Sequence, residues 1–157
     1  MVSRIIQVST FDLIVFGATG DLARRKIFPA LFNRLAAGQM PADALVICVA
    51  RKEMALDNFK SFVKEAVLLY SEIPSQKKDS IEKFLGCFKY ISLDVESDKN
   101  WNKIRDLLRV DSVRAFYLSV APRLFNEIAS RISTMGLSTD LSRIVVEKPL
   151  GVDEKSA

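Results

Sequence analysis

At 157 residues, with 49% of them hydrophobic and 27% charged, the chain is long enough to form one globular domain around its own core. Its longest unbroken apolar run, residues 44–50, has seven residues, whereas a membrane-spanning helix needs roughly 20. The net charge of +4 comes from scattered basic pairs without interleaved aromatic residues or a nucleic-acid-binding motif. These features argue against a membrane protein and against a nucleic-acid partner.

The N-terminus and the cysteines indicate the compartment. The first residues lack a sustained apolar segment and a small-residue cleavage site, so we predict no secretory signal and expect a cytoplasmic protein. Cys48 and Cys87 have no CxxC spacing, and the chain contains no histidine that could complete a mixed metal site. We therefore expect no metal ion. We also expect both cysteines to be buried thiols, because a disulfide is disfavoured in a reducing cytosol.

The first predicted elements are a strand, a glycine turn and a helix. Residues 11–16 are mostly apolar, as in a buried parallel strand, and Gly17 and Gly20 follow. Glycines permit the tight turn that brings backbone N–H groups close to a pyrophosphate, and a helix starting at Asp21 favours that anion. The spacing alone is a weak signal, because Val15 stands where the dinucleotide fingerprint GxGxxG has its first glycine.

The rest of the chain alternates between helical and strand-like periodicity. Pro29 removes one backbone donor from the first helix, which can kink it. We expect helices at about residues 21–37, 54–70, 74–85, 101–108 and 124–135, and strands at about residues 44–50, 88–93, 113–120 and 143–147. Five strands that alternate with helices predict an α/β fold, a Rossmann-like doubly wound parallel sheet with helices on both faces.

Arg51 follows the second predicted strand, at the position where a nicotinamide enzyme discriminates between coenzymes. An acidic side chain there accepts hydrogen bonds from a free ribose 2′-hydroxyl, whereas a guanidinium pairs with a 2′-phosphate and stacks on adenine. Arg51 therefore predicts a preference for NADP. On position alone a solvated arginine is an equal alternative, and Glu53 leaves room for dual coenzyme use.

Two further strand ends carry candidate coenzyme contacts. Asp94 and Val95 follow the third strand, where a doubly wound sheet places contacts with adenine. Asp94 is equally a candidate cap for a helix over residues 97–108. Ala121 and Pro122 end the fourth strand beside the topological switch point, so we expect their backbone to run along the nicotinamide ribose. The alternative for Pro122 is that it only terminates the strand.

Two motifs carry a resemblance to a known family. Residues 17–26, GATGDLARRK, resemble the coenzyme signature of the glucose-6-phosphate dehydrogenase family, and residues 147–151, EKPLG, resemble its second signature. The resemblance covers residues 11–157 and implies a domain that binds NADP. It further implies a homo-oligomeric enzyme of the pentose phosphate pathway, which oxidises glucose 6-phosphate to 6-phosphoglucono-lactone by hydride transfer.

The resemblance also implies roles for individual residues. Thr19 and Lys26 are expected to contact the coenzyme phosphates, although Lys26 is equally one of several exposed basic residues on the first helix. Lys148 is expected to leave a buried fifth strand toward the crevice and to position substrate and coenzyme, with a cis bond to Pro149. The alternative there is an ordinary Lys-Pro turn at a strand end. The expected coenzyme-binding residues are Gly17, Ala18, Thr19, Gly20, Asp21, Leu22, Lys26, Arg51, Asp94, Val95, Pro122, Glu147 and Lys148.

The general base is missing from these residues. Oxidation of a sugar hydroxyl needs a base that works near neutral pH, and this chain has no histidine. In the resembling family the base is a histidine, and an Arg-Ile-Asp-His-Tyr motif binds the sugar phosphate; we expect both beyond residue 157. We expect residues 1–10 to be a tail and residues 11–157 an NADP-binding domain, cut early in a helix capped by Asp153 and without its substrate domain. Such a chain is expected to bind NADP without turning over.

Short-chain dehydrogenases are the nearest rival class, because GATG also opens their Rossmann turn. Their acid–base chemistry needs a YxxxK pair, and no tyrosine of this chain has a lysine four residues later. The residues four positions after Tyr70, Tyr90 and Tyr117 are Pro74, Asp94 and Ala121. A non-catalytic dinucleotide-sensing module of that group remains the alternative, although such modules usually have a third glycine at the position of Ala23. A P-loop protein is disfavoured because no GK[ST] follows the turn.

Overall fold

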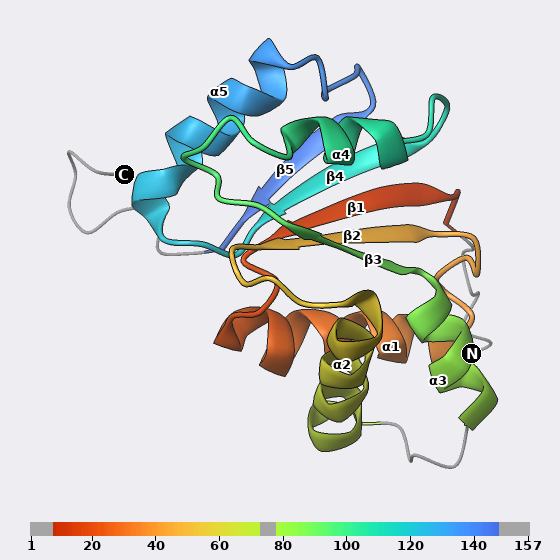
Figure 1. Cartoon of the computed structure of the whole chain (residues 1–157). Helices are drawn as coiled ribbons and strands as arrows, with labels where there is room; N and C mark the ends of the chain where they lie inside the picture. The colour runs from red at the N-terminus through yellow and green to blue at the C-terminus, as the bar shows by residue number, and fades with distance from the viewer. Residues whose placement is uncertain (1–7, 73–77, 148–157) are drawn as a thin grey trace.

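The computed structural model describes residues 8–72 and 78–147, which form a parallel sheet of five strands in the order β3-β2-β1-β4-β5 (Figure 1). The strands are β1 (Phe11–Phe16), β2 (Leu45–Ala50), β3 (Phe88–Ser92), β4 (Val113–Leu118) and β5 (Ser142–Val146). The chain runs outward from β1 to β3 and then returns to build β4 and β5 on the other side of β1. This order confirms the predicted doubly wound sheet and puts the switch point between β1 and β4.

Helices cover both faces of the sheet, as predicted (Figure 1). On one face lie α1 (Phe28–Ala36), α2 (Leu56–Tyr70) and α3 (Lys78–Gly86), and on the other lie α4 (Trp101–Leu107) and α5 (Phe125–Thr134). The central strand β1 is apolar at successive positions because its side chains enter two separate cores: Leu13 and Val15 pack under the first three helices, and Ile14 and Phe16 pack under the other two. None of the helices in the described part of the chain is both long and apolar enough to cross a membrane.

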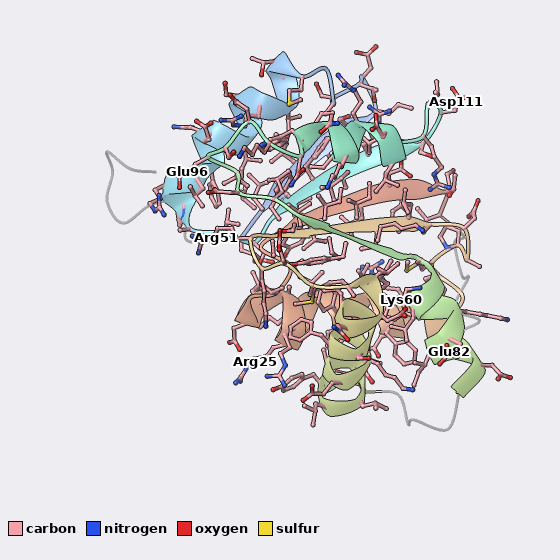
Figure 2. The ribbon with its side chains drawn as sticks, viewed as in Figure 1. Arg25, Arg51, Lys60, Glu82, Glu96 and Asp111 are labelled. Carbon is pink, nitrogen blue, oxygen red and sulfur yellow. The ribbon has the colours of Figure 1, made fainter. Side chains whose placement is uncertain are left out.

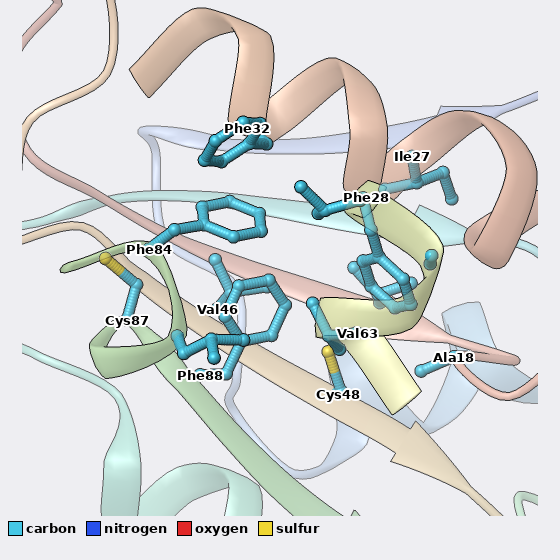
Figure 3. Close-up of a cluster of buried hydrophobic side chains, with 14 of the residues drawn as sticks. Ala18, Ile27, Phe28, Phe32, Val46, Cys48, Val63, Phe84, Cys87 and Phe88 are labelled. Carbon is cyan, nitrogen blue, oxygen red and sulfur yellow. The ribbon is translucent and has the colours of Figure 1, made fainter. Parts of the chain in front are cut away.

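Phenylalanine rings fill the core between the sheet and the first three helices (Figure 3). The ring of Phe84 packs edge-on against Phe32 at 5.5 Å and against Phe88 at 4.9 Å between centroids. Phe28 meets Phe88 at 5.7 Å in the same geometry, which is favourable for aromatic quadrupoles. Phe59, which the helical periodicity assigned to the core, is fully buried among them.

The helix after the glycine turn differs from the uniform helix that we expected over residues 21–37. It contains a π-helical turn, η1 (Ala23–Ile27), in which the N–H of Phe28 donates to the carbonyl of Ala23, five residues back. The cause is Pro29, which cannot donate to the carbonyl of Arg25 and whose ring would collide with it in a regular helix. The wider turn relieves that collision. The disturbance that we expected from Pro29 is therefore a π-helical turn.

The expectation of a buried fifth strand is wrong. β5 lies at the edge of the sheet with β4 as its neighbour, and Ile144 and Val145 are 50% and 38% exposed. Among the strands that the structure describes, β5 is thus the outermost one, and its apolar side chains are only partly covered. Lys148, Pro149 and Asp153, for which the sequence predicted a turn into the crevice and a helix cap, lie outside the described residues.

Both cysteines are buried free thiols, as expected. Burial raises the pKa of Cys48 well above its ordinary value, and burial, followed by the charge of Asp43, raises that of Cys87. We therefore expect native protein to resist an aromatic disulfide reagent at about pH 8, because the reactive thiolate is scarce and inaccessible. Unfolding in guanidinium should release both thiols. A Cys87→Ser variant isolates Cys48, and its rapid labelling in the native state would contradict the burial described here.

Candidate coenzyme site

The glycine turn joins the carboxyl end of β1 to the neighbouring strands. The N–H groups of Gly17 and Ala18 both donate to the carbonyl of Val49 in β2, at 2.9 and 3.1 Å. Gly17 has φ +81°, and a Cβ added to it would lie 1.9 Å from the carbonyl oxygen of Ser119, which follows β4. Only glycine permits both this conformation and this close approach of two strand ends. The sequence expectation of a tight turn at Gly17 is confirmed.

Gly20 closes the turn and opens the helix. Its N–H donates to the carbonyl of Gly17 at 3.0 Å, and its own carbonyl accepts the first helical hydrogen bond, from Arg24, at 3.1 Å. The N–H groups of residues 21–23 precede that bond and have no acceptor within the helix. A helix that begins in this way presents unpaired N–H groups and a positive dipole end, which suit a phosphate.

A cavity of about 290 Å³ lies at the carboxyl ends of β1, β2, β3 and β4. This is the crevice in which open α/β sheets bind their ligands, and the volume approaches the lower end of the usual range for small-molecule sites. Seven of the residues expected from the sequence line it: Gly17, Thr19, Gly20, Arg51, Asp94, Val95 and Ala121. The topology brings these residues together because parallel strands end at the same edge of a sheet.

Arg51 stands at the cavity directly after β2, and Figure 2 shows it at the same end of the sheet as Glu96. Two side chains of β3 hold the backbone at this point: Ser92 donates its hydroxyl to the carbonyl of Arg51 at 3.1 Å, and Tyr90 donates to the carbonyl of Lys52. Across residues 8–72 and 78–147, no carboxylate forms an ion pair with the Arg51 guanidinium. The site therefore offers a positioned cation that is free to bind an anion.

Asp94 shapes the loop between β3 and α4. Its carboxylate accepts the N–H of Glu96 at 3.0 Å, which closes a short turn at the cavity wall. The alternative that Asp94 caps a helix over residues 97–108 is wrong, because α4 begins at Trp101, after Asn100 in a left-handed conformation. The carboxylate is instead used in a local turn at the edge of the site.

The sequence analysis missed two charged residues of the cavity, Glu96 and Arg123. They form an ion pair with 3.5 Å between Oε1 and Nη1. Each stands close to a residue that was singled out, since Glu96 follows Asp94 by two positions and Arg123 follows Pro122 directly. Proximity to a predicted strand end was therefore the available signal, but nothing in the sequence pointed to the pairing itself.

Other expected coenzyme residues lie around the cavity rather than in its wall. Ala18 is fully buried beneath the turn, and Leu22 packs against the core under α1 and α2. Asp21 is exposed at the start of the helix, where it pairs with Arg25 at 2.8 Å. Pro122 starts the 3-10 turn η2 (Pro122–Leu124), and its neighbours on both sides line the cavity.

Lys26 and Glu147 line a second depression, of about 240 Å³, between α1 and the strands β1, β4 and β5. Tyr117 of β4 lines it too and donates its hydroxyl to the carboxylate of Glu147. Burial of the phenol, followed by this hydrogen bond and the negative charge of Glu147, raises the pKa of Tyr117 to about 12. The hydroxyl is therefore a permanent donor at neutral pH and holds the carboxylate just before Lys148.

Comparison with known proteins identifies the domain. The family model described as "Glucose-6-phosphate dehydrogenase, NAD binding domain" matches residues 14–157. The glucose-6-phosphate 1-dehydrogenase of Rhizobium meliloti is 39% identical over 159 residues, covering 100% of this chain and 32% of the relative. That of Gluconobacter oxydans is 36% identical over 155 residues, covering 96% of this chain and 32% of the relative.

Solved structures agree with the sequence relatives. The crystal structure of glucose-6-phosphate 1-dehydrogenase from Mycobacterium avium superposes with a TM-score of 0.84 at 28% identity, covering 94% of this chain and 31% of that one. A glucose-6-phosphate dehydrogenase in complex with its substrate superposes with a TM-score of 0.79 at 27% identity, covering 99% and 33%. The chain thus spans about a third of the length of the relatives that it matches. With its glycine turn, switch-point cavity and sheet order all agreeing with that match, the chain belongs to the glucose-6-phosphate dehydrogenase family and forms its dinucleotide-binding domain.

Proposed function

We propose that the cavity binds NADP in preference to NAD, in an enzyme that oxidises glucose 6-phosphate to 6-phosphoglucono-lactone. The observation that carries the coenzyme preference is the Arg51 guanidinium at the end of β2, which has no ion-pair partner in the described part of the chain. A free ribose 2′-hydroxyl would call for an acidic side chain there, whereas a 2′-phosphate matches the two-pronged donor set of arginine. The substrate, a cytoplasmic location and a homo-oligomeric enzyme are proposals supported by family membership.

The positions of the residues around the cavity suggest which part of the coenzyme each of them would contact. We propose that the turn from Gly17 to Gly20 and the first helical N–H groups receive the pyrophosphate, with the Thr19 hydroxyl as an additional donor. Asp94 and Val95 would then lie along the adenine. The backbone around Pro122, beside the switch point, would lie along the nicotinamide ribose.

The chemistry of hydride transfer would be supplied by the bound NADP, which accepts the hydride at its nicotinamide ring. The chain's part would be to orient that ring and the sugar. We propose Lys148 as the residue that positions both, and Lys26 and Glu147, which line the second depression, as further contacts of the coenzyme. No histidine is present in the chain, so the general base that the family resemblance implies is not among these residues.

Arg51→Gln is expected to weaken NADP binding by about 1.5 to 3 kcal/mol, because a hydrogen-bonded contact to a charged phosphate is lost. NAD, which lacks that phosphate, should bind with nearly unchanged affinity. Isothermal titration of both coenzymes measures the two values directly. Lys52→Gln, which removes the neighbouring exposed cation, is the matched control and should affect both coenzymes equally little. Equal losses for NADP and NAD in Arg51→Gln would contradict the proposed selectivity.

A further inference from the structure

The ion pair between Glu96 and Arg123 lies in the lining of the coenzyme cavity. Glu96 belongs to the loop after β3 and Arg123 to η2 after β4, and both side chains line the cavity. The pair therefore links the loop after β3 to η2 at the cavity that a ligand would enter.

The ion pair between Glu96 and Arg123 is weak. Its single pair of atoms is 3.5 Å apart, and the side chains of Arg123 and Glu96 remain 69% and 57% exposed. Exposed pairs of this kind contribute little to stability, because water and salt screen them and two long side chains lose rotamer freedom. An incoming anion with several phosphate oxygens can therefore compete with the carboxylate for the guanidinium.

The loop that carries Glu96 is held independently of this pair. Arg131 of α5 donates to the carbonyl of Glu96 at 3.3 Å and pairs with Asp98 of the same loop. Arg131 is itself fixed by Glu127 at 2.6 Å and lies over the ring of Trp101 at 5.8 Å. Release of Arg123 from Glu96 thus leaves the loop backbone in place, and only two exposed side chains have to move.

We infer that Arg123 is a second cation for the coenzyme phosphates and that Glu96 competes with the coenzyme for it. The guanidinium of Arg123 pairs with the carboxylate of Glu96 in this structure, and when a dinucleotide enters, the guanidinium passes from that carboxylate to phosphate oxygens. Arginine suits this exchange because its planar donors pair with carboxylates and phosphates in the same way. The inference rests on the proposed function, since it takes the cavity to bind a dinucleotide. Unlike Arg51, Arg123 would favour NAD and NADP alike, because both contain the pyrophosphate.

Titration of the full chain with NADP and with NAD tests this exchange. Arg123→Gln should weaken both coenzymes about tenfold, as expected for a lost charge-assisted contact. Glu96→Gln should tighten both about threefold, because the carboxylate that competes with the coenzyme for Arg123 is removed. The double variant should bind like Arg123→Gln alone. Without the guanidinium of Arg123, the carboxylate of Glu96 has no cation for which it competes with the coenzyme. Raising the salt concentration should reduce the effect of Glu96→Gln.

Controls and contrary results separate this inference from the proposed function. Arg105→Gln on α4 and Glu82→Gln on α3 make the same charge changes at exposed positions outside the cavity and should leave both affinities unchanged. If Glu96→Gln weakens binding, or if either variant behaves like its control, the competition is refuted while the coenzyme site stands. If the unaltered chain binds neither dinucleotide, the proposed function itself fails, and this inference with it.

Discussion

Gly17→Ala is expected to destabilise the domain by about 3 to 5 kcal/mol, a large part of the stability of a typical domain. Two costs combine at this position. An L-residue at φ +81° is strained, and the new Cβ would lie 1.9 Å from the carbonyl oxygen of Ser119. The clash is with backbone, so no side-chain rotation can relieve it, and the ends of β1 and β4 must move apart. Urea unfolding followed by circular dichroism measures the loss.

Two other glycines serve as controls for the separate costs. Gly136 has φ +65° with nothing within 4 Å of an added Cβ, so Gly136→Ala measures the strain alone, about 1 to 2 kcal/mol. Gly86 has neither a left-handed φ nor a close neighbour, and Gly86→Ala should not destabilise. A loss at Gly17 no larger than that at Gly136 would show that the strand ends separate freely and that the close approach is not required.

A substitution at Gly20, in the same turn, is expected to abolish coenzyme binding while the domain stays folded. An added Cβ would lie 3.1 Å from the carbonyl oxygen of Gly17, which a shift of a few tenths of an ångström accommodates. Gly20→Val should therefore unfold cooperatively with only a modest loss of stability, yet lose coenzyme binding, because the side chain covers the approach to the turn amides. Retained NADP binding by a folded Gly20→Val protein would mean that the phosphates bind elsewhere.

Asp12→Ala is expected to cost about 3 kcal/mol of stability, because it leaves Arg109 without its carboxylate at the amino end of the sheet. Asp12 lies within β1 and is completely buried, although its neighbours in the strand are apolar. Its oxygens accept from Nε of Arg109 at 2.7 Å and from the Arg109 backbone N–H at 2.9 Å. The same guanidinium also donates to the carbonyls of Phe11 and Asp43, at 2.9 and 2.8 Å.

The pairing energy is measured by a double-mutant cycle of Asp12→Ala and Arg109→Ala in urea unfolding. The double variant should be more stable than the sum of the single losses allows, because neither charge is then left without its partner. Lys89→Ala, at an exposed position of β3, controls for the removal of a charge from a strand. Additive losses, or a loss below about 1 kcal/mol for Asp12→Ala, would show that water replaces the carboxylate as the partner of Arg109.

Much of the fold could be predicted because its signals are local. The apolar run of β2 indicated a strand buried on both faces, and the period of Phe59 and Val63 indicated a helix packed on one side. Alternating strands and helices then restricted the topology to a doubly wound sheet. Once that order is given, Thr19, Arg51 and Asp94 must meet at one edge, and this is why the cavity contains residues chosen from the sequence alone.

What the sequence by itself determined is therefore the order of the elements, the glycine turn and the side chains at the strand ends. The tertiary structure alone decided the long-range pairings: Asp12 with Arg109, Glu96 with Arg123, and Tyr117 with Glu147. It also decided that β5 is the outermost of the described strands, with partly exposed side chains. The physical reason is that periodicity and turn chemistry act over a few residues, whereas these pairings depend on where separate crossovers return the chain, which no local pattern encodes.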